Sequence, residues 1–132
     1  MRVKRDLILI VALLALAGGA LWLVPALQRA PGDAAEGLYV RYSYDGVAQA
    51  TLPLDAEREL TLDQGDGRVN VLHLSPSGVV MQSASCYNQS CVHQGEVTLA
   101  NRASRPLYNM IVCAPHRLVV ELLTAAEALA HE

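Results

Sequence analysis

An uninterrupted apolar run near the N-terminus constrains this chain more than any other feature of its sequence. Residues 7–27 (LILIVALLALAGGALWLVPAL) lie between Asp6 and Arg29 and contain no charged side chain. At about 1.5 Å per residue, a helix of this length spans the roughly 30 Å of hydrocarbon in a bilayer. The run therefore predicts one transmembrane helix, so that the membrane is the first expected partner of the chain.

The distribution of basic residues predicts the orientation of that helix. Arg2, Lys4 and Arg5 precede the run, whereas only Arg29 follows it closely. Lys and Arg collect on the cytoplasmic side of membrane proteins, so we expect the N-terminus inside and everything after Arg29 outside. Trp22 lies near the outer end, where an indole ring favours the interface. Residues 1–28 are thus predicted to form a cytoplasmic basic stub and a single-pass anchor in the cytoplasmic membrane.

A cleaved signal peptide and a buried soluble helix are the alternatives to an anchor. The small residues at 17–20 (AGGA) resemble a cleavage site, but the apolar run continues through residues 22–24. A signal peptide has a shorter apolar core, of about 7 to 15 residues. A soluble helix without a polar face would need protein on all sides. We therefore expect the helix to stay attached.

Charge separates the rest of the chain from this segment. Beyond residue 30 there are 12 acidic residues and 6 arginines but no lysine, a net charge of about −6 with His neutral. A nucleic-acid-binding protein needs a basic surface to displace phosphate counterions. Binding to DNA or RNA is therefore not expected.

The composition changes again after the apolar run and then becomes strand-like. Residues 29–37 (RAPGDAAEG) have the small, Pro- and Gly-containing composition of a linker. Residues 38–44 alternate apolar and polar side chains, and residues 47–54 form a second strand-like run after Asp45 and Gly46. Alternation with a period of two indicates strands, and an Asp-Gly pair between them indicates a hairpin.

Short strands and turns continue through the rest of the domain. Residues 59–62, 69–74 and 79–82 are strand candidates separated by Gly-, Pro- and Ser-containing turns, and His73 falls on the face opposite Leu72 and Leu74. The fold class predicted for residues 38–123 is all-β, a small barrel-like or sandwich domain of short strands behind one N-terminal transmembrane helix. Residues 124–132 form a tail whose composition favours a short helix over 124–130.

Three cysteines are the most chemically distinctive residues of this domain. Cys86, Cys91 and Cys113 occur in the segments CYNQSCVHQG and VCAPHR, with His93 and His116 close by. Outside the membrane thiols tend to be oxidised, and a disulfide in a small domain adds about 2 to 4 kcal/mol. Three cysteines allow three pairings; proximity favours Cys86 with Cys91, and a strand that carries Cys113 past that loop would permit the others.

A metal site and a redox site are the alternatives to a structural disulfide. The five residues Cys86, Cys91, Cys113, His93 and His116 include enough ligands for zinc, but the spacing lacks the C-x2-C of zinc ribbons and the C-x-x-C-H of c-type haem sites. A thioredoxin-like redox motif would need a C-x-x-C beside a βαβ unit. His116 has a simpler interpretation as well: it follows Pro115 and is expected to cap the turn into the last strand.

Part of this pattern resembles a known family. The strand-like VNVLHL, the loop C-x-x-x-x-C-V-x-x-G and the segment I-V-C-x-P-H-R-L-V-V-E, which here are residues 69–74, 86–95 and 111–121, are similar to the NusG domain II-like family. The resemblance implies an all-β, barrel-like domain, often behind a single N-terminal membrane helix, with no assigned enzymatic activity. Family members usually have Pro-Asp where this chain has Tyr87 and Asn88, and Leu in place of Ala114. Residues 101–108 are an insertion.

No complete catalytic constellation accompanies these features. The sequence lacks a G-x-S-x-G nucleophile elbow and a phosphate-binding glycine loop. We therefore expect no catalytic residues, no cofactor and no enzymatic activity. The leading hypothesis is a membrane-anchored, extracytoplasmic module that binds or scaffolds another envelope protein and has a disulfide in its cysteine loop. The alternative hypothesis is a redox- or metal-linked accessory protein that uses the Cys and His residues.

Overall fold

The computed structural model describes residues 6–15, 18 and 37–131, and divides the chain into a unit of residues 1–35 and a unit of residues 36–132. Residues 6–15 are helical. Among the described residues, no helix has both the length and the apolar composition needed to cross a bilayer. Much of the predicted transmembrane segment, residues 7–27, lies outside the described residues, as does most of the predicted linker.

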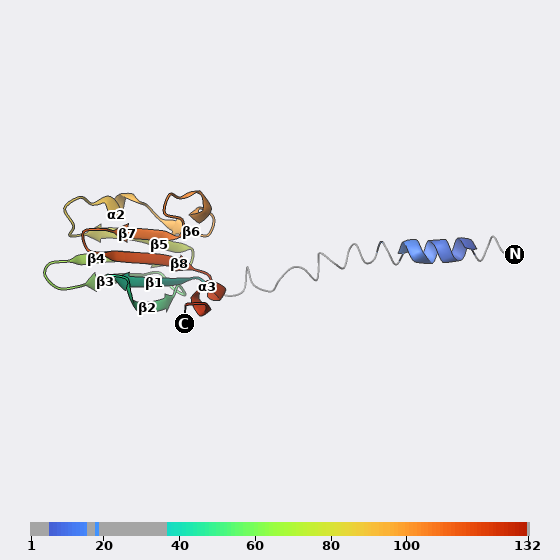
Figure 1. Cartoon of the computed structure of the whole chain (residues 1–132), viewed down its shortest axis with the longest axis horizontal. Coiled ribbons are helices and arrows are strands. Elements are labelled where there is room, and N and C mark those ends of the chain that lie inside the picture. Colours follow the sequence, from blue (N-terminus) through green and yellow to red (C-terminus); the bar gives the residue numbers. More distant parts are fainter. Residues whose placement is uncertain (1–5, 16–17, 19–36, 132) are drawn as a thin grey trace. The chain divides into compact units, whose positions relative to one another are not determined.

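Two four-stranded antiparallel sheets make up the second unit (Figure 1). The first sheet has the order β2–β1–β8–β7, with β1 at Tyr39–Tyr44, β2 at Val47–Pro53, β7 at Met110–Cys113 and β8 at Leu118–Leu123. The second has the order β3–β4–β5–β6, with β3 at Arg58–Asp63, β4 at Val69–Ser75, β5 at Gly78–Ala84 and β6 at Val97–Thr98. The all-β prediction is confirmed, but the sheets do not close into a barrel.

Alternation along the strands places one hydrophobic core between the two sheets. In β4, Leu72 and Leu74 are buried while His73 between them is half-buried on the other face. In β8, Leu118, Val120 and Leu122 are buried in the same alternating manner, as expected for a sheet with one face on a core. The cluster of buried residues draws on both sheets. Each fully buried aliphatic side chain contributes about 1.5 to 3 kcal/mol relative to exposure.

The expected hairpin forms between β1 and β2. Asp45 and Gly46 both have positive φ, 51° and 79°. This is the conformation of a two-residue type I′ turn, whose twist matches that of the strands it joins, and it explains why Asp and Gly occupy the two positions. The pairing of β1 with β8 then places the first and last strands of the domain side by side.

Three short helical segments complete the domain. Helix α2 covers Ser90–His93 in the cysteine loop, and the 3₁₀ turn η1 covers Arg102–Ser104 in the insertion. Helix α3 covers Ala125–Leu129 within the predicted tail, and Thr124 and Glu127 form a reciprocal capping box at its start. Neither α2 nor η1 was expected, because four and three residues are too short for a periodic pattern.

Candidate functional site

The fold brings the three cysteines together from three different elements. Cys86 follows β5, Cys91 lies in α2 and Cys113 ends β7. All three are buried, and their Sγ atoms lie within 4.8 Å of one another. We call these three residues the cysteine cluster. It is the group among the described residues whose His, Cys, Asp or Glu ligand atoms lie close enough to hold a metal ion.

The cysteines of the cluster are present as free thiols. The Sγ atoms of Cys86 and Cys91 are 3.6 Å apart, whereas a disulfide bond is about 2.05 Å long. The predicted disulfide is therefore not formed in this structure. The pair that sequence proximity favoured is nevertheless in sulfur-to-sulfur contact.

Burial keeps the central thiol of the cluster protonated. Loss of solvent, together with contacts to Cys113 and Cys86, raises the pKa of Cys91 from 9.0 to about 12. A buried thiolate without a neighbouring cation is costly, because the apolar surroundings do not replace its hydration. The thiol of Cys91 is therefore neutral as it stands, and a reaction at Cys91 is easier when another sulfur carries the charge.

Side-chain amides fix the loop that carries Cys86 and Cys91. Gln89 adopts a left-handed conformation with φ of 53°, and its Nε2 donates to the carbonyl oxygens of Ala84 at 2.7 Å and Cys86 at 2.5 Å. The side chain of Asn88 accepts a hydrogen bond from the backbone N–H of Ser90 at 3.2 Å. The loop is held by these polar contacts in place of a strand ladder.

A second glutamine joins this loop to the first sheet. The Nε2 of Gln94 donates to the carbonyl oxygen of Val112 at 2.7 Å, and the backbone N–H of Val112 donates to Gln94 Oε1 at 2.8 Å. Because β7 is an edge strand, its outward backbone groups would otherwise lack a strand partner. Gln94 thus holds the cysteine loop beside the strand that carries Cys113.

Arg105 fastens the insertion to the same region. Its guanidinium donates to the carbonyl oxygens of Gln94 at 3.0 Å, Glu96 at 3.1 Å and Met110 at 3.2 Å. Its Nε also donates to the carbonyl oxygen of Tyr108 at 3.3 Å. One side chain therefore satisfies acceptors on both sides of the insertion. Nothing in the spacing of the sequence identified Gln89, Gln94 or Arg105, because isolated polar residues in loops form no periodic pattern.

The two histidines proposed as alternative metal ligands do not join the cluster. His93 is exposed on α2, and His116 is buried in the turn between β7 and β8. The Nδ1 of His116 lies 2.6 Å from Asn70 Oδ1 in β4, so the pair connects the two sheets. Burial, with a smaller effect from Arg68, lowers the pKa of His116 below its usual 6.5. The structure thus reduces the five candidate ligands to three cysteines.

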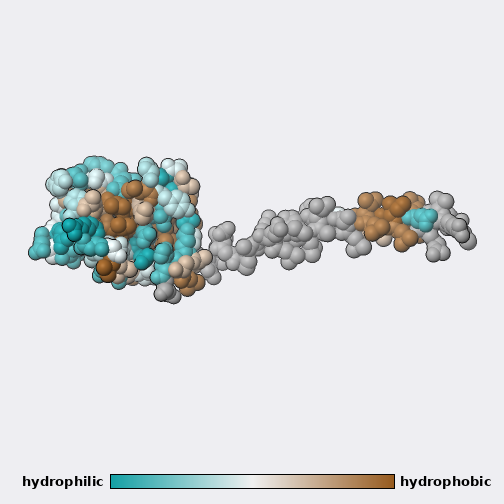
Figure 2. All heavy atoms as spheres, viewed as in Figure 1, coloured by the Kyte–Doolittle hydropathy of each residue, from teal (hydrophilic) through white to brown (hydrophobic). Residues whose placement is uncertain are grey.

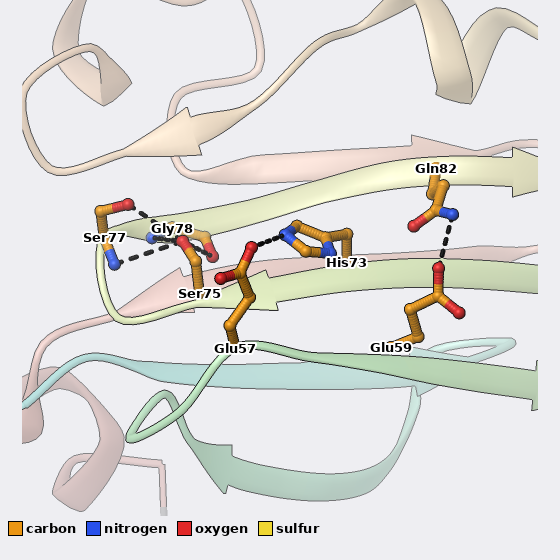
Figure 3. A network of polar contacts seen from close by, with 7 residues as sticks. All are labelled: Glu57, Glu59, His73, Ser75, Ser77, Gly78 and Gln82. Atoms are coloured by element: carbon orange, nitrogen blue, oxygen red, sulfur yellow. Dashed lines mark hydrogen bonds and ion pairs between the residues drawn. The ribbon is translucent and has the colours of Figure 1, made fainter.

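His73 belongs to a surface network (Figure 3). His73 Nε2 lies 3.0 Å from Glu57 Oε1, and Gln82 Nε2 donates to Glu59 Oε1 at 2.6 Å. These side chains lie on the outer face of β4, β5 and the start of β3, as the alternation of His73 with two leucines predicts. Exposed pairs of this kind contribute about 0 to 1 kcal/mol and indicate a solvated surface.

Comparisons with known proteins agree with this architecture. The chain is similar in structure to the Lin0431 protein from Listeria innocua, with a TM-score of 0.55, 18% identity and coverage of 68% of this chain and 99% of that one. It is also similar to a DUF1312 family protein from Enterococcus faecalis, with a TM-score of 0.56, 18% identity and coverage of 67% and 98%. At this identity the likeness shows the fold alone. The comparison with curated proteins gave no match.

The family assignment comes from the sequence match. The model of the family described as NusG domain II matches residues 7–126, which is most of the chain. The match includes the strands of both sheets and all three cysteines. The chain therefore belongs to the NusG domain II family.

Proposed function

We propose that this chain is an extracytoplasmic β module, anchored in the cytoplasmic membrane by residues 7–27, that binds another envelope protein without catalysing a reaction. The uncharged run of residues 7–27 and the basic residues before it support the anchor and its orientation. The family match begins at residue 7, so the apolar segment belongs to the family pattern. The acidic balance after residue 30 disfavours nucleic acid as the partner.

The observation that carries the binding proposal is an exposed aromatic residue on a fixed loop. The side chain of Tyr87 is 89% exposed, directly between the buried Cys86 and the hydrogen-bonded Asn88. Tyr is enriched in protein interfaces, and a loop that is already ordered loses less entropy on binding. Tyr87 is thus an exposed aromatic side chain that an ordered loop presents to a partner.

An apolar strip beside the loop extends this surface. Figure 2 shows hydrophobic residues gathered over β7 and β8 on the face in view, surrounded by hydrophilic ones. The half-buried Met110, Val112 and Val119 alternate with core residues on these two paired strands, and Val112 and Val119 are directly opposite each other. A protein partner would cover the strip together with the loop, which Gln94 holds against the edge of β7.

Site-specific photo-crosslinking in intact membranes tests the binding proposal. Replacing Tyr87 with p-benzoylphenylalanine should give an adduct with one discrete envelope protein after illumination. The matched control places the same amino acid at Leu129, which is 67% exposed but lies in α3. The proposal fails if position 87 gives no adduct, or gives the same adducts as position 129.

A redox- or metal-linked accessory role is the second candidate, and the cysteine cluster favours it. Three Sγ atoms within 4.8 Å of one another suit either a disulfide or a soft metal ion, because thiolates prefer Cu(I) and Zn(II). Oxidation of Cys86 and Cys91 would give a disulfide, which is uncharged and so leaves no thiolate charge buried in the domain. Thiol counting with and without reductant, combined with metal analysis, distinguishes these states: one thiol without metal supports the disulfide, and stoichiometric metal supports the metal site.

A further inference from the structure

The third cysteine of the cluster has no role in a single structural disulfide. A Cys86–Cys91 bridge needs two sulfur atoms, but Cys113 is buried within 4.8 Å of both. Cys91 contacts Cys86 and Cys113 at the same time, and these contacts contribute to the raised pKa of its thiol. Cys91 is therefore the sulfur that either neighbour can bond. The two possible bridges differ in what they join, since one closes the loop on itself and the other attaches it to β7.

We propose that the cysteine cluster is a thiol–disulfide exchange site in which Cys91 is the shared sulfur and its bridge alternates between Cys86 and Cys113. This inference concerns the chain alone and does not depend on the binding partner proposed above. It assigns a role to each cysteine: Cys86 exchanges with the outside, Cys91 is bonded in both forms, and Cys113 is the internal attacking group.

The first bridge forms by exchange with an external disulfide such as oxidised glutathione. The thiolate of Cys86 attacks one sulfur of that disulfide, which releases one external thiol and leaves a mixed disulfide on Cys86. Cys91 then attacks the Cys86 sulfur while its proton passes to the departing thiolate, so that the Cys86–Cys91 bond forms and the second external molecule leaves as a thiol. Two protein thiols are oxidised and one external disulfide is reduced to two thiols. Cys86 is the least buried of the three residues, since it is 5% exposed whereas Cys91 and Cys113 are 0% exposed, and it is therefore the one we assign to the external exchange.

The internal step needs no oxidant. Cys113 loses its proton and attacks the Cys91 sulfur; the Cys91–Cys113 bond forms while the Cys86–Cys91 bond breaks, and Cys86 leaves as a thiolate that takes up a proton. The negative charge moves from Cys113, which is 0% exposed, to the slightly less buried Cys86, where solvent is nearer. Burial therefore favours the departure of Cys86 as the leaving group.

The exchange changes how the loop is attached. With the Cys86–Cys91 bridge, contacts such as the two Gln94–Val112 hydrogen bonds hold the loop to β7. With the Cys91–Cys113 bridge, a covalent bond joins α2 to the end of β7, and Cys86 is released from its bond beside the exposed Tyr87. The position of the bridge is thus coupled to the segment that carries Tyr87.

Disulfide mapping of the purified full-length chain in a glutathione redox buffer tests the exchange. After acid quenching, alkylation and digestion, we expect two populations of the wild-type chain. One has the Cys86–Cys91 bridge with a free thiol at Cys113, and the other has the Cys91–Cys113 bridge with a free thiol at Cys86. C86S should form neither bridge, because the exchange with the external disulfide starts at Cys86. C113S should form only the Cys86–Cys91 bridge, and C91S should lose both. The wild-type measurement needs no variant to fold, so a destabilised variant does not remove the test.

Three results would overturn the proposal. One is a wild-type chain with the Cys86–Cys91 bridge alone and a free thiol only at Cys113. Another is a C86S variant that folds, as judged by circular dichroism, and still forms the Cys91–Cys113 bridge. The last is a reduced chain that takes up one equivalent of added Zn(II) or Cu(I) and then resists oxidation, which would assign the cluster to metal binding.

Discussion

The paired strands and the segment of residues 85–109 are held together by different interactions. In the strands, backbone ladders and alternating buried residues such as Leu72 and Leu122 provide the order. In the segment, β6 contributes only two paired residues, and side chains that bond to backbone groups provide most of the order, above all those of Gln94 and Arg105. The strands can therefore lose a polar side chain at little cost, whereas the segment depends on a few such groups.

This difference has a functional consequence. The segment contains Cys86, Cys91 and the exposed Tyr87, while the strands supply the rigid base and Cys113. Segments held by few contacts open at lower free energy than the core of a domain. We therefore expect the cysteine loop to exchange its amide hydrogens before β4 and β8 do.

The largest effect should follow truncation of the core between the sheets. Leu72→Ala removes a fully buried side chain of β4 and should lower the free energy of unfolding by about 3 kcal/mol, because a cavity adds to the lost burial. Urea unfolding followed by circular dichroism measures it. Thr61→Ala, on the exposed face of the neighbouring strand β3, is the control and should change stability by less than about 0.5 kcal/mol. Equal effects at the two sites would contradict the sandwich core.

The next largest effect should be local to the insertion. Arg105→Ala leaves four carbonyl acceptors without their donor, and should cost about 2 kcal/mol since hydrogen bonds to charged groups are the stronger ones. Hydrogen exchange should accelerate in residues 94–110 and much less in β4. Arg117→Ala is the matched control, because the Arg117 side chain makes, within the described part of the chain, only an exposed ion pair with Asp45. Uniform acceleration over the whole domain would show that the segment and strands unfold together.

A smaller effect is expected where the insertion meets α3. Burial raises the pKa of Glu127, but hydrogen bonds from Arg102 and Thr124 outweigh it, so the folded-state pKa lies below 4.5. The stabilisation is present above pH 4.5 and is lost as the pH falls through the folded pKa. Glu127→Gln should therefore cost about 1 kcal/mol at pH 7, because the pair is partly exposed, and should cost progressively less in acid. A cost that does not change with pH would contradict the ion pair.

The smallest effect is a pH dependence at the pair between the sheets. The pKa of His116 is lowered in the folded chain, so the unfolded chain binds a proton first as the pH drops below 6.5. Stability should hold above that pH and decline from it down to the folded pKa. Comparing wild type with His116→Gln in urea unfolding from pH 8 to pH 5 isolates this effect. A wild type that gains stability relative to the variant below pH 6.5 would reverse the assigned shift.

The same contrast decides what the sequence can predict. Alternation in residues 38–44 and 69–74 predicted strands with the correct faces. Successive side chains of a strand point to opposite faces, so the polarity of each residue indicates which face it occupies. The Asp45–Gly46 turn was predictable for a similarly local reason. His116 was expected to cap a turn, but its partner Asn70 is 46 positions away, and no local pattern encodes such a contact. The cysteine cluster could be predicted only as one of several alternatives. It forms because the end of β7 places Cys113 beside the loop of Cys86 and Cys91, and this tertiary arrangement is not encoded in a local pattern.

A measurement of membrane topology tests the central claim most directly, namely that the β domain lies outside the cytoplasmic membrane. The anchor, a partner for the exposed loop and the oxidation of the cysteines all depend on that location. The full-length chain should carry an epitope tag after residue 132, and protease should be added to intact cells. We expect the protease to remove the tag while a cytoplasmic control protein stays whole. A tag that becomes sensitive only after the cells are broken would place the domain inside and contradict the account.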